Sequence, residues 1–509
     1  MKNENQIYFD NLPEGNMLEI DIYPKKFEFE TNPLSGLPAL PERPGTLTVP
    51  SVTQTQREMA RTPGAVTVVP TAKYQDTYAH NIEDVMDFTP GVFARKRYGA
   101  EVRLSVRGSG LSRGFHMRGL ELLQDGIPFN LADGSADFQE VDPLIAQHIE
   151  VYKGGNGLRF GASSLGGAIN FVMPTAYSAD AQNLVRLEGG SFGSYRIHTQ
   201  ASRIYENTDV FAAMSANKVD GFRDHEKEES IRFSGNIGHR FNHEAETRFY
   251  ILSNIVDQEL PGTLTLQQAL ETPEMAAPAN VTQHQQRNVR SIRIANKTAI
   301  RLDNGGLFEF GGYAGYKRLY HPIFQVIDQR GPLAGLFTRY RDEGSLAGHR
   351  NILTVGGDLS WGEVDAKRFV NIAGSRGALT ASGTQSSTNL RLYAENQFYV
   401  LDDVALVGGV QAIHSYRKFT NDLAPAQSDA TDFSSVSPKA GVLWDVADNA
   451  QLYANVTRSY EPPTFSELVQ ATVFQFVPLD PQRAVTYEVG TRGATATLAW
   501  DVAIYHARV

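Results

Sequence analysis

The glycine-rich stretch 149–172 (IEVYKGGNGLRFGASSLGGAINFV) is the part of the sequence that comes nearest to a chemical motif. Its glycines from Gly155 to Gly161 follow a GxGxxxG spacing, which differs by one residue from the dinucleotide-binding fingerprint. No Lys-Ser or Lys-Thr pair follows, as a phosphate-binding loop requires. Apolar residues alternate on both sides of the glycines, and this alternation is typical of strands. We therefore predict a glycine-rich hairpin rather than a cofactor site.

The remaining residues show no catalytic pattern. The sequence has no HExxH helix, and no pair of carboxylates has a spacing that predicts general acid–base catalysis. The chain contains no cysteine, which excludes disulfides, thiolate metal sites and a cysteine nucleophile. We therefore predict that the protein is not an enzyme.

Charge and hydropathy limit the possible partners. The 509 residues carry a net charge of −10 without any basic run, so nucleic acid is not an expected partner. No apolar stretch approaches the roughly 20 residues of a membrane-spanning helix, so a membrane could be crossed only by β-strands. The acidic N-terminus lacks the apolar core of a secretory signal peptide, and we expect that no signal peptide is present in this sequence.

Composition and periodicity divide the chain into three parts. Residues 1–63 are rich in proline and predict a flexible segment, in which TLTV at 46–49 is a short β-prone stretch suited to strand addition. Residues 64–174 predict an α+β domain, with strands at 65–69, 102–107 and 120–124. Two helices are expected in this domain, one after Asn81 and one at Asp142-Pro143, because both positions suit a helix N-terminus.

From about residue 183 the sequence pattern changes to segments of roughly ten residues with alternating apolar and polar side chains. Val185 and Leu187, for example, oppose Arg186 and Glu188. Short turns alternate with long polar connections, which we expect at 261–289, 366–388 and 464–482. Several long loops are rare in soluble domains and usual in outer-membrane barrels, so we predict a transmembrane antiparallel β-barrel, with about 15 strands in 183–509.

A series of short motifs resembles the TonB-dependent outer-membrane receptors, most closely the ferric-siderophore and ferric-citrate branch. The matches occur in the family's order at TLTV (46–49), GAVTVV (64–69), NIEDVM (81–86), PGV (90–92), VRG (106–108), LLQDGIP (122–128), IEVYKGG (149–155) and LGGAIN (165–170). Lys153 stands where the family usually has Arg, and Gly155 where it usually has Pro. The resemblance covers residues 46–509.

The resemblance implies a mainly β fold, in which 64–174 form a plug domain inside the lumen of the barrel formed by 183–509. Such barrels have about 22 strands, so we expect that the sequence is truncated at its C-terminus. The glycines of 149–172 would then serve close packing, and bulky side chains at Gly166 or Gly167 would harm docking of the plug.

The resemblance also implies a binding segment near the N-terminus. Residues 46–50 correspond to the region of the Ton box, which is named for its binding to TonB, and TonB acts with ExbB and ExbD. Because such a peptide pairs with a partner's sheet edge, we expect it to be extended and flexible. The residues expected to form it are Thr46, Leu47, Thr48 and Val49.

The family further implies the location and the site residues. We expect a monomer among the lipids of the cell outer membrane of a Gram-negative bacterium, without a cofactor or metal site, because iron arrives already chelated. Ligand-binding residues are expected in apical plug loops at 95–101, 109–118 and 130–138, because a guanidinium matches carboxylate oxygens and an aromatic ring can stack on a ligand. The expected plug residues are Arg95, Arg97, Tyr98, Arg113, Phe115, His116, Arg118, Asp133, Asp137 and Phe138, and those of the barrel are Tyr320 and His321. Arg107 and Lys153 of the plug are expected to form ion pairs with Glu395 and Glu488 of the barrel.

The function implied is active uptake of a ferric chelate, such as a siderophore or ferric citrate. Haem, cobalamin, a nickel chelate and a carbohydrate are alternative ligands for the same scaffold. A passive or adhesive outer-membrane barrel, and a receptor that also signals across the envelope, are further alternatives.

Overall fold

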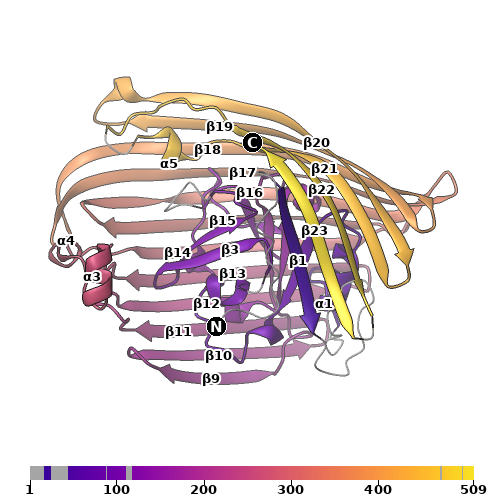
Figure 1. Ribbon diagram of the computed structural model, residues 1–509, viewed down its shortest axis with the longest axis horizontal. Helices are drawn as coiled ribbons and strands as arrows, with labels where there is room; N and C mark the ends of the chain where they lie inside the picture. The colour runs from indigo at the N-terminus through magenta and orange to yellow at the C-terminus, as the bar shows by residue number, and fades with distance from the viewer. Residues whose placement is uncertain (1–15, 25–43, 88, 111–116, 471–472, 496) are drawn as a thin grey trace.

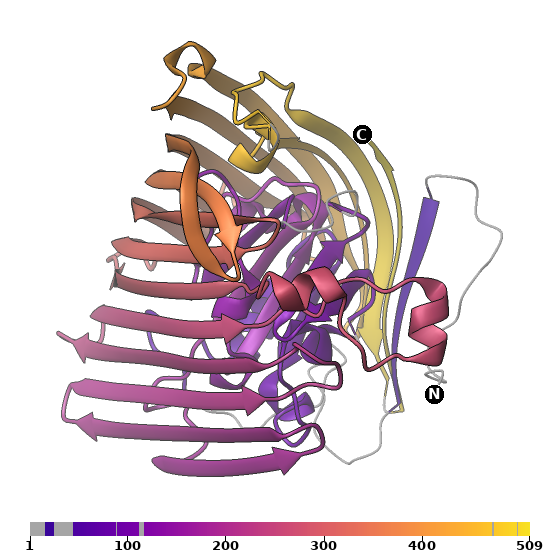
Figure 2. The ribbon, with the colours of Figure 1, turned by 90° about the vertical axis from the view of Figure 1, so that its left-hand side faces the viewer.

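The computed structural model describes residues 16–24, 44–87, 89–110, 117–470, 473–495 and 497–509. A 16-stranded antiparallel sheet curves around a smaller N-terminal unit (Figures 1 and 2). The order of this sheet runs from β9 (Asn183–Gly190) through consecutive strands to β23 (Leu498–Arg508), which pairs with β1 (Asn16–Pro24). The fold is therefore a curved β wall with a plug on its concave side.

The plug contains a five-stranded sheet, a two-stranded hairpin and short helices. The sheet has the order β2-β7-β8-β5-β6, in which β5 and β8 are parallel, and β3 pairs with β4. The elements are α1 (Val52–Met59), β2 (Val66–Pro70), α2 (Ile82–Met86), β3 (Val92–Tyr98), β4 (Glu101–Val106), β5 (Leu120–Gln124), β6 (Ile127–Pro128), β7 (His148–Lys153) and β8 (Gly167–Val172), with 3-10 turns at Thr71–Lys73, Phe138–Glu140, Pro143–Ile145 and Gly154–Phe160.

The plug core is built from the apolar faces of these elements. Ile82 and Met86 of α2 pack with Leu122, Ile149 and Ile169 of the sheet, and each of the five side chains is nearly inaccessible. The expected helix after Asn81 is confirmed, and Asn81 and Asp84 form a capping box at its start. At Asp142-Pro143 the structure has one 3-10 turn instead of the expected helix, because Ala146 already returns to an extended conformation. Across the described ranges, no helix is long and apolar enough to span a membrane.

The glycine-rich stretch 149–172 forms the predicted hairpin. Strands β7 and β8 pair in antiparallel register, from His148 opposite Val172 to Lys153 opposite Gly167. Gly167 has a φ of 95°, and a Cβ atom there would lie 1.9 Å from the carbonyl oxygen of Tyr152. The glycine is therefore required by close backbone approach within the plug sheet.

The described part of residues 183–509 contains 15 strands of the wall, in agreement with the predicted number. Their bounds are β9 (Asn183–Gly190), β10 (Ser194–Tyr205), β11 (Thr208–Val219), β12 (Glu228–Arg240), β13 (Ala245–Gln258), β14 (Asn288–Arg301), β15 (Leu307–Pro322), β16 (Gln325–Leu346), β17 (His349–Ile372), β18 (Ser375–Leu401), β19 (Val404–Asn421), β20 (Asp429–Ala447), β21 (Ala450–Glu461), β22 (Gln482–Ala494) and β23 (Leu498–Arg508).

The wall strands place apolar side chains on the outer face and polar side chains on the inner face, which is the reverse of a sheet in a soluble protein. Outward-facing Val185 and Leu187 are 68% and 72% exposed, whereas Arg232 and Asn236 on the inner face are buried against the plug. An apolar band of this extent is unfavourable in water and is stabilised by lipid. The wall is therefore a transmembrane sheet whose polar face surrounds the plug.

Two of the three predicted long connections are present, and the third is wrong. Residues 259–287 contain α3 (Leu266–Glu271) and α4 (Pro278–Thr282), and residues 462–481 contain α5 (Phe465–Leu468). Residues 366–388, however, continue β17 and β18 to a tight turn at 373–374. Their small polar side chains suggested a loop, but strand pairing uses backbone groups and tolerates polar residues outside the membrane.

Residues 44–63 also differ from the flexible segment that composition predicted. Ser51 and Gln54 form a capping box that starts α1, and Met59 at its end is buried in the plug. Helix α1 therefore joins the plug and brings 46–49 to the inner face of the wall.

Candidate functional site

The two ends of the wall differ in the length of their connections. Turns such as 206–207, 302–306 and 402–403 are short, and they lie at one end, which we call the turn end. The longer connections 259–287 and 462–481 lie at the opposite end, which we call the loop end. A cavity of about 110 Å³ is lined by Glu461 at the start of connection 462–481, and a cavity of about 190 Å³ is lined by Arg301 and Leu307 beside a short turn. We refer to them as the loop-end cavity and the turn-end cavity.

The loop-end cavity lies between the plug and the wall and contains buried arginines. Arg118 of the plug pairs with Glu467 and lies 3.6 Å from Glu461. Arg391 of β18 lies 2.9 Å from Asp358 and 2.8 Å from Glu121 of the plug. Each of these guanidinium groups is thus compensated by two carboxylates, which ties the plug to the wall.

The first group of predicted ligand residues does not line this cavity. Residues 95–101, expected to be an apical loop, form the end of strand β3 and its turn into β4. Arg95 pairs within the plug with Glu83 at 3.2 Å and with Asp87 at 3.0 Å. Arg97 pairs with Glu101 at 3.1 Å, and Tyr98 is buried. The predicted loop is wrong, because these residues pair as a β-hairpin and their charged side chains form ion pairs within the plug.

Two of the other predicted plug residues occupy different settings. Asp137 pairs with Arg287 at 2.6 Å and Lys317 at 2.7 Å, and these cations hold the pKa of its carboxyl well below the usual range. The neighbouring Phe138 belongs to the plug core rather than to a binding surface. Arg113, Phe115 and His116 lie outside the described residues.

The predicted barrel residues are engaged by backbone groups at the loop end. The Tyr320 hydroxyl donates to the Gly374 carbonyl at 2.8 Å, and His321 Nδ1 lies 2.6 Å from the Gln286 carbonyl. Neither lines the loop-end cavity, which among the predicted and described ligand residues contains only Arg118 and Asp133. Within the described ranges, no group of three or more His, Asp or Glu side chains is arranged to hold a metal ion.

The predicted ion pair of Arg107 joins the plug to the wall. The guanidinium of Arg107 meets Glu488 in a bidentate contact of 2.9 and 3.1 Å, and both side chains are buried. Glu488 also accepts from the Ala65 backbone N–H at 2.7 Å. Glu395, in contrast, pairs with Lys439 of β20 at 2.9 Å, which is a contact within the wall. The predicted pairing of Glu395 with the plug is therefore wrong, because a lysine two strands away on the same inner face of the wall neutralises this carboxylate.

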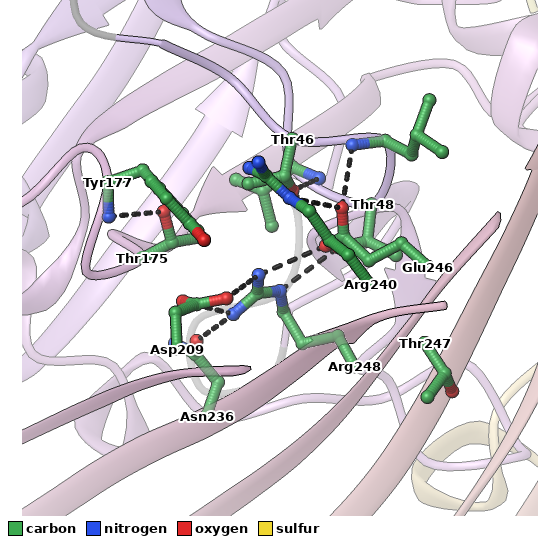
Figure 3. A network of polar contacts seen from close by, with 12 residues as sticks. Thr46, Thr48, Thr175, Tyr177, Asp209, Asn236, Arg240, Glu246, Thr247 and Arg248 are labelled. Atoms are coloured by element: carbon green, nitrogen blue, oxygen red, sulfur yellow. Dashed lines mark hydrogen bonds and ion pairs between the residues drawn. The ribbon is translucent and has the colours of Figure 1, made fainter. Parts of the chain in front are cut away.

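Residues 46–49 are held on the wall near the turn end (Figure 3). Thr48 is fully buried, its hydroxyl donates to Glu246, and it accepts from Arg248 Nε at 3.0 Å. The Leu47 N–H donates to Glu246 at 3.0 Å. Arg248 also binds Asp209 at 2.8 Å, so one buried guanidinium connects two wall carboxylates with the segment.

The extended conformation expected for residues 46–49 is wrong for this structure, most clearly at Val49. The Thr46 N–H donates to the Val49 carbonyl at 2.7 Å, and the Val49 N–H donates to Thr46 Oγ1 at 3.0 Å. These two bonds close a turn, and the side chain of Val49 is only 1% exposed. Burial of an apolar side chain is favourable and the turn satisfies backbone groups that a strand would leave open, so both effects stabilise the folded-back segment.

Sequence analysis did not single out Glu246, Arg248 or Asp209. The alternation of polar and apolar residues indicates that these side chains face inward. It does not reveal their contact with Thr48, which lies 198 residues before Glu246 and 200 before Arg248 in the sequence. Arg159 of the plug was also not predicted as a contact residue. Its guanidinium lies 2.6 Å from Glu58, which is 101 residues earlier in the sequence. Only the fold brings such residues together.

The carboxyl of Asp125 lies buried at the turn between β5 and β6. Burial raises its pKa from 3.8 to about 7, although Lys297 and the Met173 N–H, 3.0 Å from Oδ1, act in the opposite direction. Its Oδ2 atom has no hydrogen-bond partner among the described residues. The folded protein therefore binds more protons than the unfolded chain between these two pH values, and this group lowers the free energy of unfolding as pH rises from about 4 to 7.

We expect Asp125→Asn to increase the free energy of unfolding at pH 8 by up to about 4 kcal/mol and to change it little at pH 4. Asparagine tolerates the positive φ of this position, 50°, and keeps the acceptor for Met173. The measurement is urea unfolding in detergent at both pH values. Asp137→Asn is the control of opposite sign, because its lowered pKa predicts a loss of stability at pH 8. Equal effects of Asp125→Asn at both pH values would contradict the assignment.

Comparison with known families agrees with this architecture. The family model described as TonB-dependent Receptor Plug Domain matches residues 58–168. The model described as TonB dependent receptor-like, beta-barrel matches residues 279–509. Together the two models account for more than half of the chain and match its two structural parts.

Individual relatives are more distant. The Vitamin B12 transporter BtuB of Vibrio vulnificus (strain CMCP6) is 22% identical over 488 residues, which cover 93% of this chain and 72% of the relative. The Ferripyoverdine receptor of Pseudomonas aeruginosa (strain PAO1) is 33% identical over 162 residues, covering 31% of this chain and 18% of the relative.

Solved structures share the fold at low identity. The unliganded ferric citrate transporter FecA has a TM-score of 0.71 at 16% identity, covering 85% of this chain and 68% of FecA. The ferric yersiniabactin uptake receptor FyuA from Yersinia pestis has a TM-score of 0.71 at 16% identity, covering 88% of this chain and 73% of FyuA. From its plug, its inverted barrel wall and the two matching family models, the chain belongs to the TonB-dependent receptors, whose fold is an outer-membrane β-barrel.

Proposed function

We propose that the complete protein takes up a ferric chelate, such as a siderophore or ferric citrate, by active transport driven through TonB with ExbB and ExbD. The observation that carries this proposal is the position of the plug between the loop-end cavity and residues 46–49. Long connections of outer-membrane barrels face the outside, and short turns face the periplasm. A ligand in the loop-end cavity and TonB at residues 46–49 would therefore act on opposite ends of one plug.

The ligand class is supported by the relatives, which include receptors for ferripyoverdine and ferric citrate. Cobalamin is the second candidate, because the Vitamin B12 transporter aligns with 93% of this chain. Growth of a strain with the full-length gene, compared with its deletion, on defined iron or cobalamin sources separates the two. Rescue by cobalamin alone would contradict the ferric chelate.

The role of 46–49 is tested by Leu47→Pro. Because the segment is folded back in this structure, TonB would have to bind it after its release into an extended form. Proline removes the backbone N–H and disfavours the strand that addition to a partner sheet requires, so we expect uptake of ⁵⁵Fe chelate to fall to the level of a TonB deletion. Binding of the same chelate to whole cells is expected to persist, because Leu47 is not among the residues that line the loop-end cavity.

Leu47→Ala is the matched control, since it shortens the side chain and keeps the N–H that donates to Glu246. We expect this variant to retain uptake. Uptake by the Leu47→Pro variant at the wild-type rate would exclude energised transport through this segment.

A further inference from the structure

Arg417 is a buried cation on the wall of the loop-end cavity. Its side chain, on β19, is 2% exposed. One terminal nitrogen donates to Asn389 Oδ1 at 2.8 Å and to the Tyr416 carbonyl at 3.1 Å, whereas Nε has no hydrogen-bond partner among the described residues. Both contacts are neutral, so they orient the guanidinium without neutralising it.

This arrangement differs from that of the other arginines in the same cavity. Arg118 and Arg391 each have two carboxylates, as described above. Among the described residues, no carboxylate lies within ion-pair distance of Arg417. Asp133 lines the same cavity and acts on Arg417 electrostatically, but its carboxylate accepts from Ser135 and from the Phe465 N–H at 3.2 Å. The nearby carboxylate of Asp133 therefore binds connection 462–481 rather than Arg417.

A second unsatisfied group lies beside Arg417. Ser415 is two positions earlier on β19 and thus on the same face of the strand. It is completely buried, it lines the cavity, and its hydroxyl has no hydrogen-bond partner among the described residues. A buried cation and a buried hydroxyl without a compensating anion are costly to maintain unless a ligand satisfies them.

We propose that Arg417 and Ser415 form a subsite for a carboxylate of the transported ligand, which places the ligand in the class of carboxylate-bearing ferric chelates. A carboxylate matches the guanidinium fork and accepts from a hydroxyl at the same time. Asn389 acts as a positioning residue, because it holds the guanidinium through Oδ1. This inference rests on the proposed function, since it specifies the ligand of the same transport path.

The size of the cavity fits one arm of such a ligand. Its volume of about 110 Å³ is below the roughly 300–1,000 Å³ of pockets that enclose whole ligands. It exceeds the roughly 10–15 Å³ needed for one water molecule. The subsite therefore selects for a terminal carboxylate rather than enclosing the iron centre.

The test uses the full-length receptor in detergent, with ferric citrate and iron-free citrate as carboxylate probes and ferrioxamine B as a chelate without a carboxylate. Titration calorimetry measures binding to the wild type, Arg417→Gln and Arg417→Lys. We expect Arg417→Gln to weaken binding of the carboxylate probes about 10- to 100-fold, with a smaller loss for Arg417→Lys, which keeps the charge and loses the fork. Arg458→Gln on β21 is the control, because Arg458 is not among the residues lining the cavity and donates to the Val436 carbonyl.

Thermal unfolding separates this role from a structural one. Arg417→Gln removes an uncompensated buried charge, so its melting temperature without ligand is expected to equal or exceed that of the wild type. Citrate is expected to raise the melting temperature of the wild type and not that of Arg417→Gln. A large decrease in the ligand-free melting temperature, with unchanged citrate binding, would assign Arg417 to stability and overturn the subsite.

The remaining outcomes separate the subsite from the transport function. Equal binding of carboxylate probes by wild type and Arg417→Gln, no binding of them by the wild type, or preference for inorganic phosphate would overturn the subsite. Uptake of ferrioxamine B alone, unaffected by Arg417→Gln, would also overturn it and leave iron transport in place. If Arg417-dependent citrate binding occurs in a protein that supports no iron uptake, the subsite stands and the proposed function fails.

Discussion

Replacing Glu488 with glutamine is expected to lower the free energy of unfolding by about 3 kcal/mol and to loosen the plug in the barrel. The substitution keeps the shape of the side chain but removes the negative charge that faces the buried guanidinium of Arg107. Glu488 also accepts from Ala65 N–H, from Asn156 at 3.1 Å and from Asn455 at 3.2 Å. A neutral amide cannot satisfy all these donors, so several plug contacts weaken together.

Chemical unfolding in detergent measures the stability, and single-protein conductance in a planar bilayer reports movement of the plug. Glu343→Gln is the matched control, because the Arg61–Glu343 pair also joins the plug side to the wall, at 2.8 Å, but is solvent-exposed. Exposed pairs contribute about 0–1 kcal/mol, so the control is expected to behave like the wild type. Equal effects of the two substitutions would show that burial of the Arg107–Glu488 pair is not what stabilises the plug.

Replacing Arg248 with methionine is expected to have an effect of similar size and to release residues 46–49 from the wall. The fully buried guanidinium contacts Asp209, Glu246, Asn236 and the Thr48 hydroxyl. Methionine fills much of the volume but removes the cation that pairs with the buried Asp209 and leaves Glu246 only the more distant Arg240, at 3.8 Å, at a cost of about 3–5 kcal/mol. The segment would lose Arg248 directly, and repulsion between the carboxylates would displace Glu246, its other partner.

The chain has no cysteine, so a single cysteine introduced at Leu47, which keeps the N–H that donates to Glu246, can carry a spin label. Electron paramagnetic resonance is expected to show an immobile label in the Leu47→Cys protein and a mobile label when Arg248→Met is added. Arg290→Met is the control, because its pair with Asp257 is half-exposed on the wall. A label that stays immobile in the Arg248 variant would mean that other contacts, such as the burial of Val49, hold the segment.

Local sequence patterns predicted many of the elements and, through short motifs, the family. The alternation of Val185 and Leu187 with Arg186 and Glu188 predicted a strand with one lipid-facing side, because the two-residue period is a local property. The capping residues of α2 and the glycines of the β7–β8 hairpin were readable for the same reason. The apical loop at 95–101 failed because charged residues of a two-stranded hairpin look like a polar loop.

Contacts between segments distant in sequence were predicted correctly in one case and wrongly in another. Strand alternation and the family resemblance together placed Arg107 and Glu488 correctly between plug and barrel. The β-prone composition of 46–49 failed to predict the turn that buries Val49. That turn is stabilised by wall residues far away in sequence, such as Glu246, which is 198 residues from Thr48. Intrinsic strand preference is weak compared with such tertiary contacts.

The sequence by itself thus determined a plugged transmembrane sheet, its family and the polarity of the strand faces that alternation predicted. Only the tertiary structure decided which charges are neutralised. Arg118, Arg391 and Arg417 all face the loop-end cavity, yet in the part of the chain that the structure describes only the first two meet carboxylates, from residues up to 349 positions away. The energy of a buried charge depends on groups within a few ångströms in space, and strand register and plug placement set those distances. The sequence alone therefore did not separate the arginines that hold the plug from the one left available to a ligand.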